Sequence, residues 1–140
     1  MAVLLGQKLV KDTKEYNDYA IGITLPLQIG NTAFNQSFQT IDQVRTNIKN
    51  LLLTKRKERV MQPVLGSGLQ ELLFDFNDET LADNIEETII GAFEQWLPYV
   101  IVDTIDVRQT DFMKDTNTVE ISITFSIDGN PSLETVTFTL

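Results

Sequence analysis

Two stretches of the chain carry apolar residues at the spacing of an amphipathic helix. The first stretch has its apolar positions at Ile41, Val44, Ile48, Leu51 and Leu52. Their spacings of three, four and seven place them on one face of a helix. Thr40, followed three residues later by Gln43, is typical of a capping box. We therefore expect a helix that begins at Thr40 and ends near Thr54.

The second stretch predicts a longer helix. Its apolar stripe consists of Leu81, Ile85, Ile89, Ala92, Phe93 and Trp96. Thr80, with Asp83 three residues on, indicates the start of this helix, and Pro98 ends it. Trp96 has two interpretations, a binding hot spot or a core residue. Its place on the apolar stripe favours core packing.

Towards the end of the chain the pattern changes to the alternation that is typical of half-buried strands. Residues 99–107 alternate apolar and polar positions, although Val100 and Val102 blur the pattern. Residues 119–127 alternate cleanly, and residues 135–140 interleave threonines with Val136, Phe138 and Leu140. Turn residues at 115–117 and 128–131 separate the three segments. These features predict an α+β fold with a three-stranded antiparallel C-terminal meander packed on two or three helices.

The last strand raises a question about its edge. It has no charged residue after Glu134 and no proline after Pro131. Edge strands in soluble proteins are usually protected by lysine, proline or a bulge, and the sequence shows none of these here. Either this strand lies in the middle of the sheet, or its edge pairs with a strand from another chain.

The N-terminal part of the chain differs in character from the rest. Polar, Gly and Pro residues interrupt short apolar pieces up to about residue 36. We expect residues 1–36 to form an extended arm with one brief strand near Ile21 to Leu27, and residues 37–140 to form the domain. An arm with this many apolar residues is expected to lie on the domain or on a neighbouring molecule.

A connector with the sequence TKRKERVMQPVLGSGLQELLF, residues 54–74, joins the two predicted helices. Its basic residues are Lys55, Arg56, Lys57 and Arg59. Positive charge suits the C-terminal end of the helix before it. Pro63 prevents the helix from continuing, and Gly66 and Gly68 permit a tight turn. A short helix then places Leu69, Leu72 and Leu73 towards the core.

Composition excludes several classes of function. The chain has no Cys and no His, which removes disulfides, the usual zinc sites and catalysis by thiol or imidazole groups. We expect neither a metal nor another cofactor. A net charge of -9 argues against nucleic acid as a partner. The sequence has no apolar run long enough to span a membrane, so a membrane is not expected as a partner either.

The charge is distributed unevenly along the chain. No Lys or Arg occurs between Val60 and Val107, where acidic residues accumulate, whereas residues 55–59 are basic. Such polarity suits docking between charged neighbours. The alternative is that the acidic residues form a solvated helix face.

The connector resembles the motif T-x-x-G-x-R-x-x-x-P-x-F-G-x-x-L-x-x-x-L-F of the baseplate wedge and sheath-initiator family of contractile phage tails, which type VI secretion systems share. The matching residues are Thr54, Arg59, Pro63, Gly66, Leu69, Leu73 and Phe74. Lys57 replaces the usual glycine, and Leu65 replaces the usual phenylalanine. The likeness covers roughly Phe38 to Leu140.

Two further segments bear on this resemblance. A closing F-S-x-x-x-N-P pattern is present at Phe125, Ser126, Asn130 and Pro131. Family members often carry Glu-Pro-Arg after the long helix, where this chain has Leu97, Pro98 and Tyr99. An ionic contact made through that Glu and Arg is therefore in doubt for this protein.

The resemblance implies a structural subunit, rather than an enzyme, in the baseplate of a contractile tail. Such a subunit is found in the virion, and in the host cytoplasm during assembly. The family's C-terminal sheet is expected to initiate the sheath by pairing with a strand of the first sheath ring, so the tail sheath protein is the expected partner. The docking strand would comprise Thr135, Val136, Thr137, Phe138, Thr139 and Leu140, with the apolar positions setting its register.

The resemblance also implies contacts with other baseplate wedge proteins and with the tail tube or hub. For these contacts we expect Arg59, Pro63, Trp96, Pro98 and Tyr99. For Arg59, a structural contact to helix-end carbonyls and a solvated basic loop are both open.

Three other functions are open from the sequence. Some family members are described as lysozyme-like, and a muramidase needs only two suitably spaced carboxylates, for which Glu58 and Glu71 flank the connector. No carboxylate pair lies in an obviously apolar context, which disfavours this reading. The chain could instead belong to a type VI secretion-like baseplate, or act as a soluble regulator that grips a cytoplasmic partner.

Overall fold

The computed structural model of the 140-residue chain describes residues 17–25, 35–72, 80–109 and 118–140. The fold is α+β, as the sequence predicts, and ends in a three-stranded antiparallel sheet with the strand order β3-β4-β5. None of the helices in these segments has the length and apolar content that a membrane-spanning helix requires.

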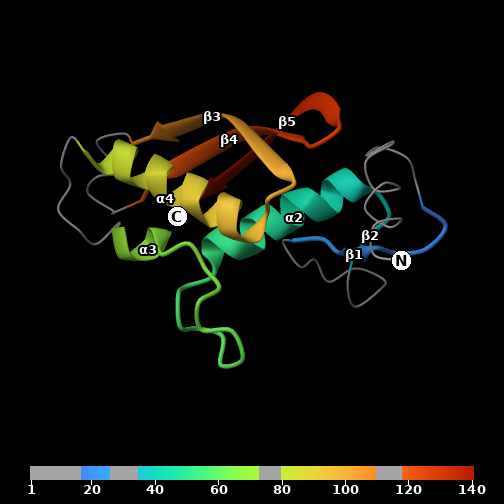
Figure 1. Cartoon of the computed structure of the whole chain (residues 1–140), viewed down its shortest axis with the longest axis horizontal. Helices are drawn as coiled ribbons and strands as arrows, with labels where there is room; N and C mark the ends of the chain where they lie inside the picture. The colour runs from blue at the N-terminus through green and yellow to red at the C-terminus, as the bar shows by residue number, and fades with distance from the viewer. Residues whose placement is uncertain (1–16, 26–34, 73–79, 110–117) are drawn as a thin grey trace.

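The helices and strands lie close to their expected positions. The helices are α2 (Thr40–Leu53), α3 (Leu69–Leu72) and α4 (Leu81–Trp96). The main sheet consists of β3 (Val100–Arg108), β4 (Glu120–Ile127) and β5 (Asn130–Thr139). A second, two-stranded sheet pairs β1 (Gly22–Ile23) with β2 (Gln36–Ser37). Figure 1 shows α4 and α2 on one side of the main sheet, and the loop between α2 and α3 projecting away from that sheet.

One face of the main sheet and the apolar faces of the helices form the core. From α2 and α4 the buried residues are Ile41, Val44, Ile48, Leu51, Leu52, Leu81, Ile85, Ile89, Ala92 and Phe93. The middle strand β4 buries every second residue, with Ile121, Ile123 and Phe125 fully enclosed. Trp96 packs against this cluster and is partly buried. The period of each element therefore decides which of its residues enter the core.

A bulge in β3 explains why its sequence alternates imperfectly. Val102 pairs with Phe125 and Ile105 pairs with Ile123, and the register shifts between these pairs, at Asp103. One inserted residue reverses the face on which all later side chains point. The bulge therefore directs Val100 and Val102 before it, and Ile105 and Val107 after it, towards the core, while Ile101 is exposed.

The helix starts fall where expected, but the predicted capping boxes are wrong. The residue before α2 is Gln39, and neither it nor Thr80 before α4 makes a side-chain capping hydrogen bond. Gln43 is engaged elsewhere, because its side-chain oxygen accepts from the Ser37 hydroxyl at 2.7 Å and its nitrogen donates to Asn47 at 2.9 Å. The last turn of α2 also contains no basic residue, so the basic cluster follows the helix rather than ending it.

The described part of the N-terminal arm lies on α2. The Leu25 N–H donates to the Thr46 hydroxyl at 3.5 Å, and the Ile21 N–H donates to the Ser37 carbonyl at 2.8 Å. A Cβ atom on Gly22 would lie 1.9 Å from the Gln43 side-chain oxygen, so a larger residue here would displace the end of the Gln43 side chain. The strand expected near residues 21–27 is limited to β1, and its predicted end, the turn at 115–117 and Leu73 lie outside the described residues.

Candidate functional site

The strand β5 lies at one edge of the main sheet and pairs only with β4 among the described strands. In an antiparallel ladder, residues that exchange two hydrogen bonds with their partner alternate with residues whose N–H and C=O point away from it. Val119 and Leu140 exchange both backbone hydrogen bonds, each at 3.0 Å. By this alternation the backbone groups of Thr135, Thr137 and Thr139 are directed to the outer edge of β5.

The side chains of the same strand divide between two faces. Val136 and Phe138 are 4% and 9% exposed and belong to the protein's own core. Thr135 and Thr137 lie on the other face, where their hydroxyls meet Thr124 at 3.3 Å and Ser122 at 3.2 Å. Of the residues predicted to dock a partner, the threonines are therefore exposed and the apolar pair fixes β5 on β4.

The edge formed by β3 differs from the edge formed by β5. The bulge at Asp103 interrupts β3, and Asp106 pairs with Arg108 at 2.8 Å on its outer face. A bulge and charged residues discourage pairing with another strand. In β5 the register shifts only near its start, between the partners of Phe125 and Ile127, and is regular from Glu134 to Thr139. From the sequence, no bulge was expected in this strand. The irregular pairing of its first residues corrects that expectation.

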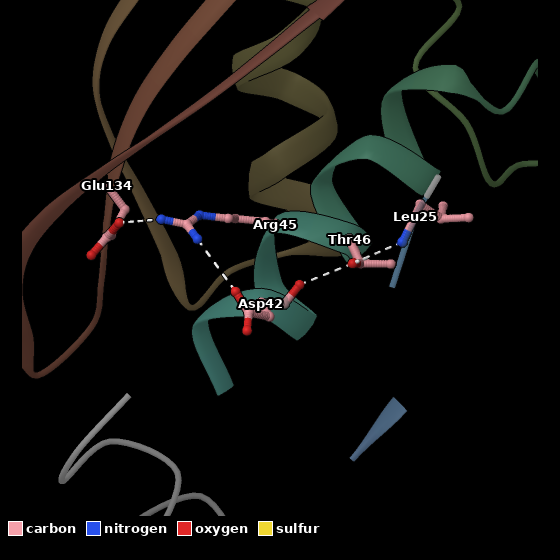
Figure 2. A network of polar contacts seen from close by, with 5 residues as sticks. All are labelled: Leu25, Asp42, Arg45, Thr46 and Glu134. Carbon is pink, nitrogen blue, oxygen red and sulfur yellow. Dashed lines mark hydrogen bonds and ion pairs between the residues drawn. The ribbon is translucent and has the colours of Figure 1, made fainter. Parts of the chain in front are cut away.

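An ion pair fastens β5 to α2. Arg45 of α2 donates to the carboxylate of Glu134 on β5 and also to Asp42, at 3.3 Å (Figure 2). The Glu134 side chain is only 12% exposed, because it points to the helix side of the sheet. The neighbouring Thr46 donates to the Asp42 carbonyl at 2.9 Å and accepts from the Leu25 N–H. One turn of α2 therefore holds both the edge strand and the N-terminal arm.

This ion pair was not anticipated from the sequence. Its two residues are separated by 89 positions, and no local pattern connects them. The sequence does give one indication of it. Glu134, Val136 and Phe138 are spaced two residues apart, so their side chains point to the same face of the strand. A carboxylate at an inward position of a strand requires a partner, because an uncompensated buried charge is costly.

The connector is a rigid, folded loop. The Lys57 N–H donates to the Pro63 carbonyl at 2.7 Å, and thereby closes the loop. A Cβ atom on Gly66, which has φ +133°, would lie 2.6 Å from the Thr54 carbonyl oxygen. The buried Ser67 hydroxyl donates to the Leu52 carbonyl at the end of α2, at 2.8 Å, and accepts from the N–H of Leu69 at the start of α3. Ser67 therefore joins two helix ends.

Two charged residues of the connector make local contacts. Arg59 is exposed and donates to the Asn50 side-chain oxygen at 3.1 Å, rather than to a helix-end carbonyl. Glu58 accepts from the Lys55 N–H at 2.9 Å and so takes part in the loop structure. Glu71 lies exposed on α3.

Arg59 and Tyr99, which the sequence assigned to wedge contacts, converge on one face of α2. The Tyr99 hydroxyl accepts from the Asn47 side chain at 3.3 Å. Asn47 and Asn50 are three residues apart and therefore adjacent on the helix surface. We call the group of Asn47, which is partly buried, and the exposed Asn50, Arg59 and Tyr99 the α2 polar face.

The turn between α4 and β3 is held by both apolar and polar contacts. Leu97 is buried, and its N–H donates to the Phe93 carbonyl at 2.8 Å at the end of α4. Pro98 and Tyr99 are exposed, and the Tyr99 carbonyl accepts from the Asp128 N–H at 2.9 Å. The indole N–H of Trp96 is buried and has no hydrogen-bond partner among the described residues.

Comparison with known proteins identifies the family. Residues 39–132 match the family described as "Baseplate wedge protein gp25". The chain belongs to this family of baseplate proteins, and a structural role in a tail baseplate follows from that membership. The comparison with curated protein sequences gives no match.

Two solved structures share the fold. A Geobacter sulfurreducens protein proposed to be a tail lysozyme aligns with a TM-score of 0.62 at 18% identity, over 81% of this chain and 94% of that chain. A chain of the anti-feeding prophage baseplate aligns with a TM-score of 0.55 at 14% identity, over 84% of this chain and 81% of that chain. At these identities the similarity establishes the fold, which is the fold described above.

Proposed function

We propose that the protein initiates the contractile sheath by offering the outer edge of β5 to a strand of a sheath subunit. The observation that carries this proposal is the row of Thr135, Thr137 and Thr139, whose backbone N–H and C=O groups point away from β4. In β-strand addition, backbone hydrogen bonds supply affinity, and side chains on the two faces supply specificity. Family membership, which gives the protein a role in a baseplate, is consistent with this proposal.

The contrast between the two sheet edges supports the choice of β5. The β3 edge has a bulge and neighbouring charged residues, which block continuous pairing. The β5 edge is regular over Glu134 to Thr139, and threonine is a favourable strand residue. An added strand would therefore extend the sheet next to β5, where the pairing is regular and the residues favour a strand.

The attachment of β5 supports the proposal, because it holds the strand in place before a partner binds. Val136 and Phe138 anchor the strand in the core, and Arg45 ties its first regular residue, Glu134, to α2. A strand fixed at several points keeps its edge extended before a partner arrives. Such preorganisation reduces the ordering cost of binding.

We further propose that the α2 polar face, with the neighbouring Pro98, contacts other baseplate components. Its residues lie on exposed parts of a helix, a rigid connector and a turn. Tyr99 stands where other family members carry the Arg of an ionic Glu-Pro-Arg group, and its hydroxyl, with the side chains of Asn47 and Asn50 on α2, offers hydrogen bonds instead. Pro63 lies in the same connector. Trp96 is partly buried and packs against the core.

A proline at position 137 tests the sheath proposal. Thr137→Pro removes an N–H that points away from β4, so the protein's own ladder keeps its hydrogen bonds, and proline is tolerated at such edge positions. We expect baseplates that assemble but carry at least about tenfold fewer sheaths, since one lost ladder bond and a steric clash together exceed roughly 1.4 kcal/mol. Electron microscopy of purified tails measures the sheathed fraction.

The matched control is Thr137→Val, which retains the N–H and the strand preference and should retain the sheath. Deletion of residues 136–140 is a poorer test, because Val136 and Phe138 belong to the core and their loss would unfold the protein. If folded Thr137→Pro protein gives normally sheathed tails, sheath initiation through this edge is wrong.

No contact among the described residues favours muramidase activity as a second function. Glu58 is occupied by the Lys55 N–H, and Glu71 is exposed on α3. A cell-wall turnover assay with purified protein, and with Glu58→Gln and Glu71→Gln as controls, tests this activity directly.

A further inference from the structure

The tip of the connector exposes apolar side chains. Val60 is 94% exposed and Met61 is 92% exposed, and Val64 beside them is 62% exposed. Figure 1 shows this loop extending from the end of α2, on the side of the helices away from the main sheet. We call Val60, Met61 and Val64 the connector tip. Apolar residues held almost fully in water on a rigid loop are typical of a contact that another surface completes.

The chemistry around the tip is basic. Lys55, Arg56, Lys57 and Arg59 are all exposed in the same loop, although the whole chain has a net charge of -9. Two backbone hydrogen bonds shape this loop: the Lys57 N–H donates to the Pro63 carbonyl at 2.7 Å, and the Gln62 N–H donates to the Arg59 carbonyl at 3.2 Å. A surface that receives this tip needs an apolar floor and an acidic rim.

The same molecule carries a surface of this kind between α4 and β3. A groove of about 270 Å³ lies there, and the apolar residues that line it are Ile90, Phe93, Val100, Val102 and Ile105. Glu86, Glu94 and Asp103, which are exposed, also line it, and none of the described residues that line it is basic. We call this hollow the α4–β3 groove. Its apolar and acidic lining residues complement the tip and its basic surroundings.

We propose that the connector tip of one copy docks in the α4–β3 groove of a second copy. The contact joins two different surfaces, so each copy has one tip and one groove to offer, and repetition gives a ring or an open array rather than a closed two-fold dimer. Opposite charges at the two surfaces orient the copies head to tail and offset the repulsion between molecules of equal net charge.

The contact is small, and its strength is limited accordingly. Three side chains bury far less than the roughly 800 Å² per partner of a standard stable complex. Copies that a baseplate holds close together would form the contact readily, because tethering raises their effective concentration. Free in solution, the protein is expected to associate weakly and reversibly, and less so at high salt.

Analytical ultracentrifugation of the full chain, up to about 1 mM protein, tests the proposal at low and high salt. We expect the average mass to rise with concentration at low salt and to fall when salt is added. Met61→Asp places a negative charge on the tip, and Ile90→Asp places one among the apolar residues that line the groove. Each variant alone is expected to be monomeric. An equimolar mixture is expected to form a heterodimer, since one variant retains an intact groove and the other retains an intact tip.

Disulfide trapping tests the pairing of the two surfaces, because the natural chain has no cysteine. A mixture of Met61→Cys and Ile90→Cys proteins should crosslink between copies at least about tenfold more than a mixture of Met61→Cys and Leu133→Cys proteins. Leu133 serves as the control because it is exposed on β5, outside the groove. The proposal is overturned if wild-type protein remains monomeric at all concentrations and the two crosslinking yields are equal.

Discussion

At the scale of single residues, Lys57 occupies a backbone conformation that favours glycine. Its φ of +68° is in the left-handed region, where a side chain is disfavoured by roughly 1–2 kcal/mol. The sequence motif of the family usually has glycine at this position. The loop is therefore kept in shape by its surroundings, including the hydrogen bond to the Pro63 carbonyl.

We predict that Lys57→Gly stabilises the protein. Relief of the left-handed strain outweighs the added entropy of glycine in the unfolded chain, and the net gain in free energy of unfolding should be about 0.5–1 kcal/mol. Urea denaturation measures it. Lys55→Gly is the matched control, because it removes the same charge from the same loop at a residue without positive φ. The control should lose about 0.5 kcal/mol, and a loss of the same size in Lys57→Gly would show that the strain is absent.

At the scale of elements, the helices could be predicted from the sequence because their core contacts repeat every three or four residues. Ile48 and Ile89, both completely buried, lie on the predicted stripes. The strand β4 was equally clear. The capping box of α2 failed because the Gln43 side chain bonds to Ser37 and Asn47, an arrangement that competes with the local motif. Local patterns therefore predict where an element lies better than they predict how its end is satisfied.

The parts of the site that escaped prediction depend on contacts between distant segments. The convergence of Arg59 and Tyr99 on α2 requires the folded connector and the folded turn together. The bulge in β3 is visible in the sequence only as an irregular alternation, and its position became clear from the pairing of Val102 and Ile105. The sequence left open whether the last strand lies in the middle of the sheet or at its edge, and the strand order of the structure places it at the edge.

The ion pair between α2 and β5 gives a prediction at this scale. Arg45→Met deprives Glu134 of its cation, whereas Glu134→Gln leaves Arg45 its contact with Asp42. Arg45→Met should therefore destabilise the protein more than Glu134→Gln, and the double variant should show a coupling energy of about 1 kcal/mol. Thermal or urea denaturation of the three variants measures this coupling.

Asp42→Asn is the control for this cycle, because the contact between Asp42 and Arg45 is more exposed. It should change the free energy of unfolding by less than about 0.5 kcal/mol. A coupling near zero between Arg45 and Glu134 would mean that the ion pair does not hold the edge strand.

At the scale of the whole molecule, the fold separates four surfaces. The edge of β5 offers backbone groups, the α2 polar face offers side-chain hydrogen bonds, and the connector tip and α4–β3 groove offer complementary charge. Such a division suits a subunit that contacts several neighbours in a baseplate at once. The central claim concerns the first surface, since sheath initiation depends on β5 being completed by another chain.

The most direct measurement is a cryo-electron microscopy structure of the baseplate together with its first sheath ring. The account predicts that a strand of a sheath subunit runs alongside β5 and exchanges backbone hydrogen bonds with Thr135, Thr137 and Thr139. A structure in which this edge faces solvent, or is covered by a segment of the same chain, would contradict it.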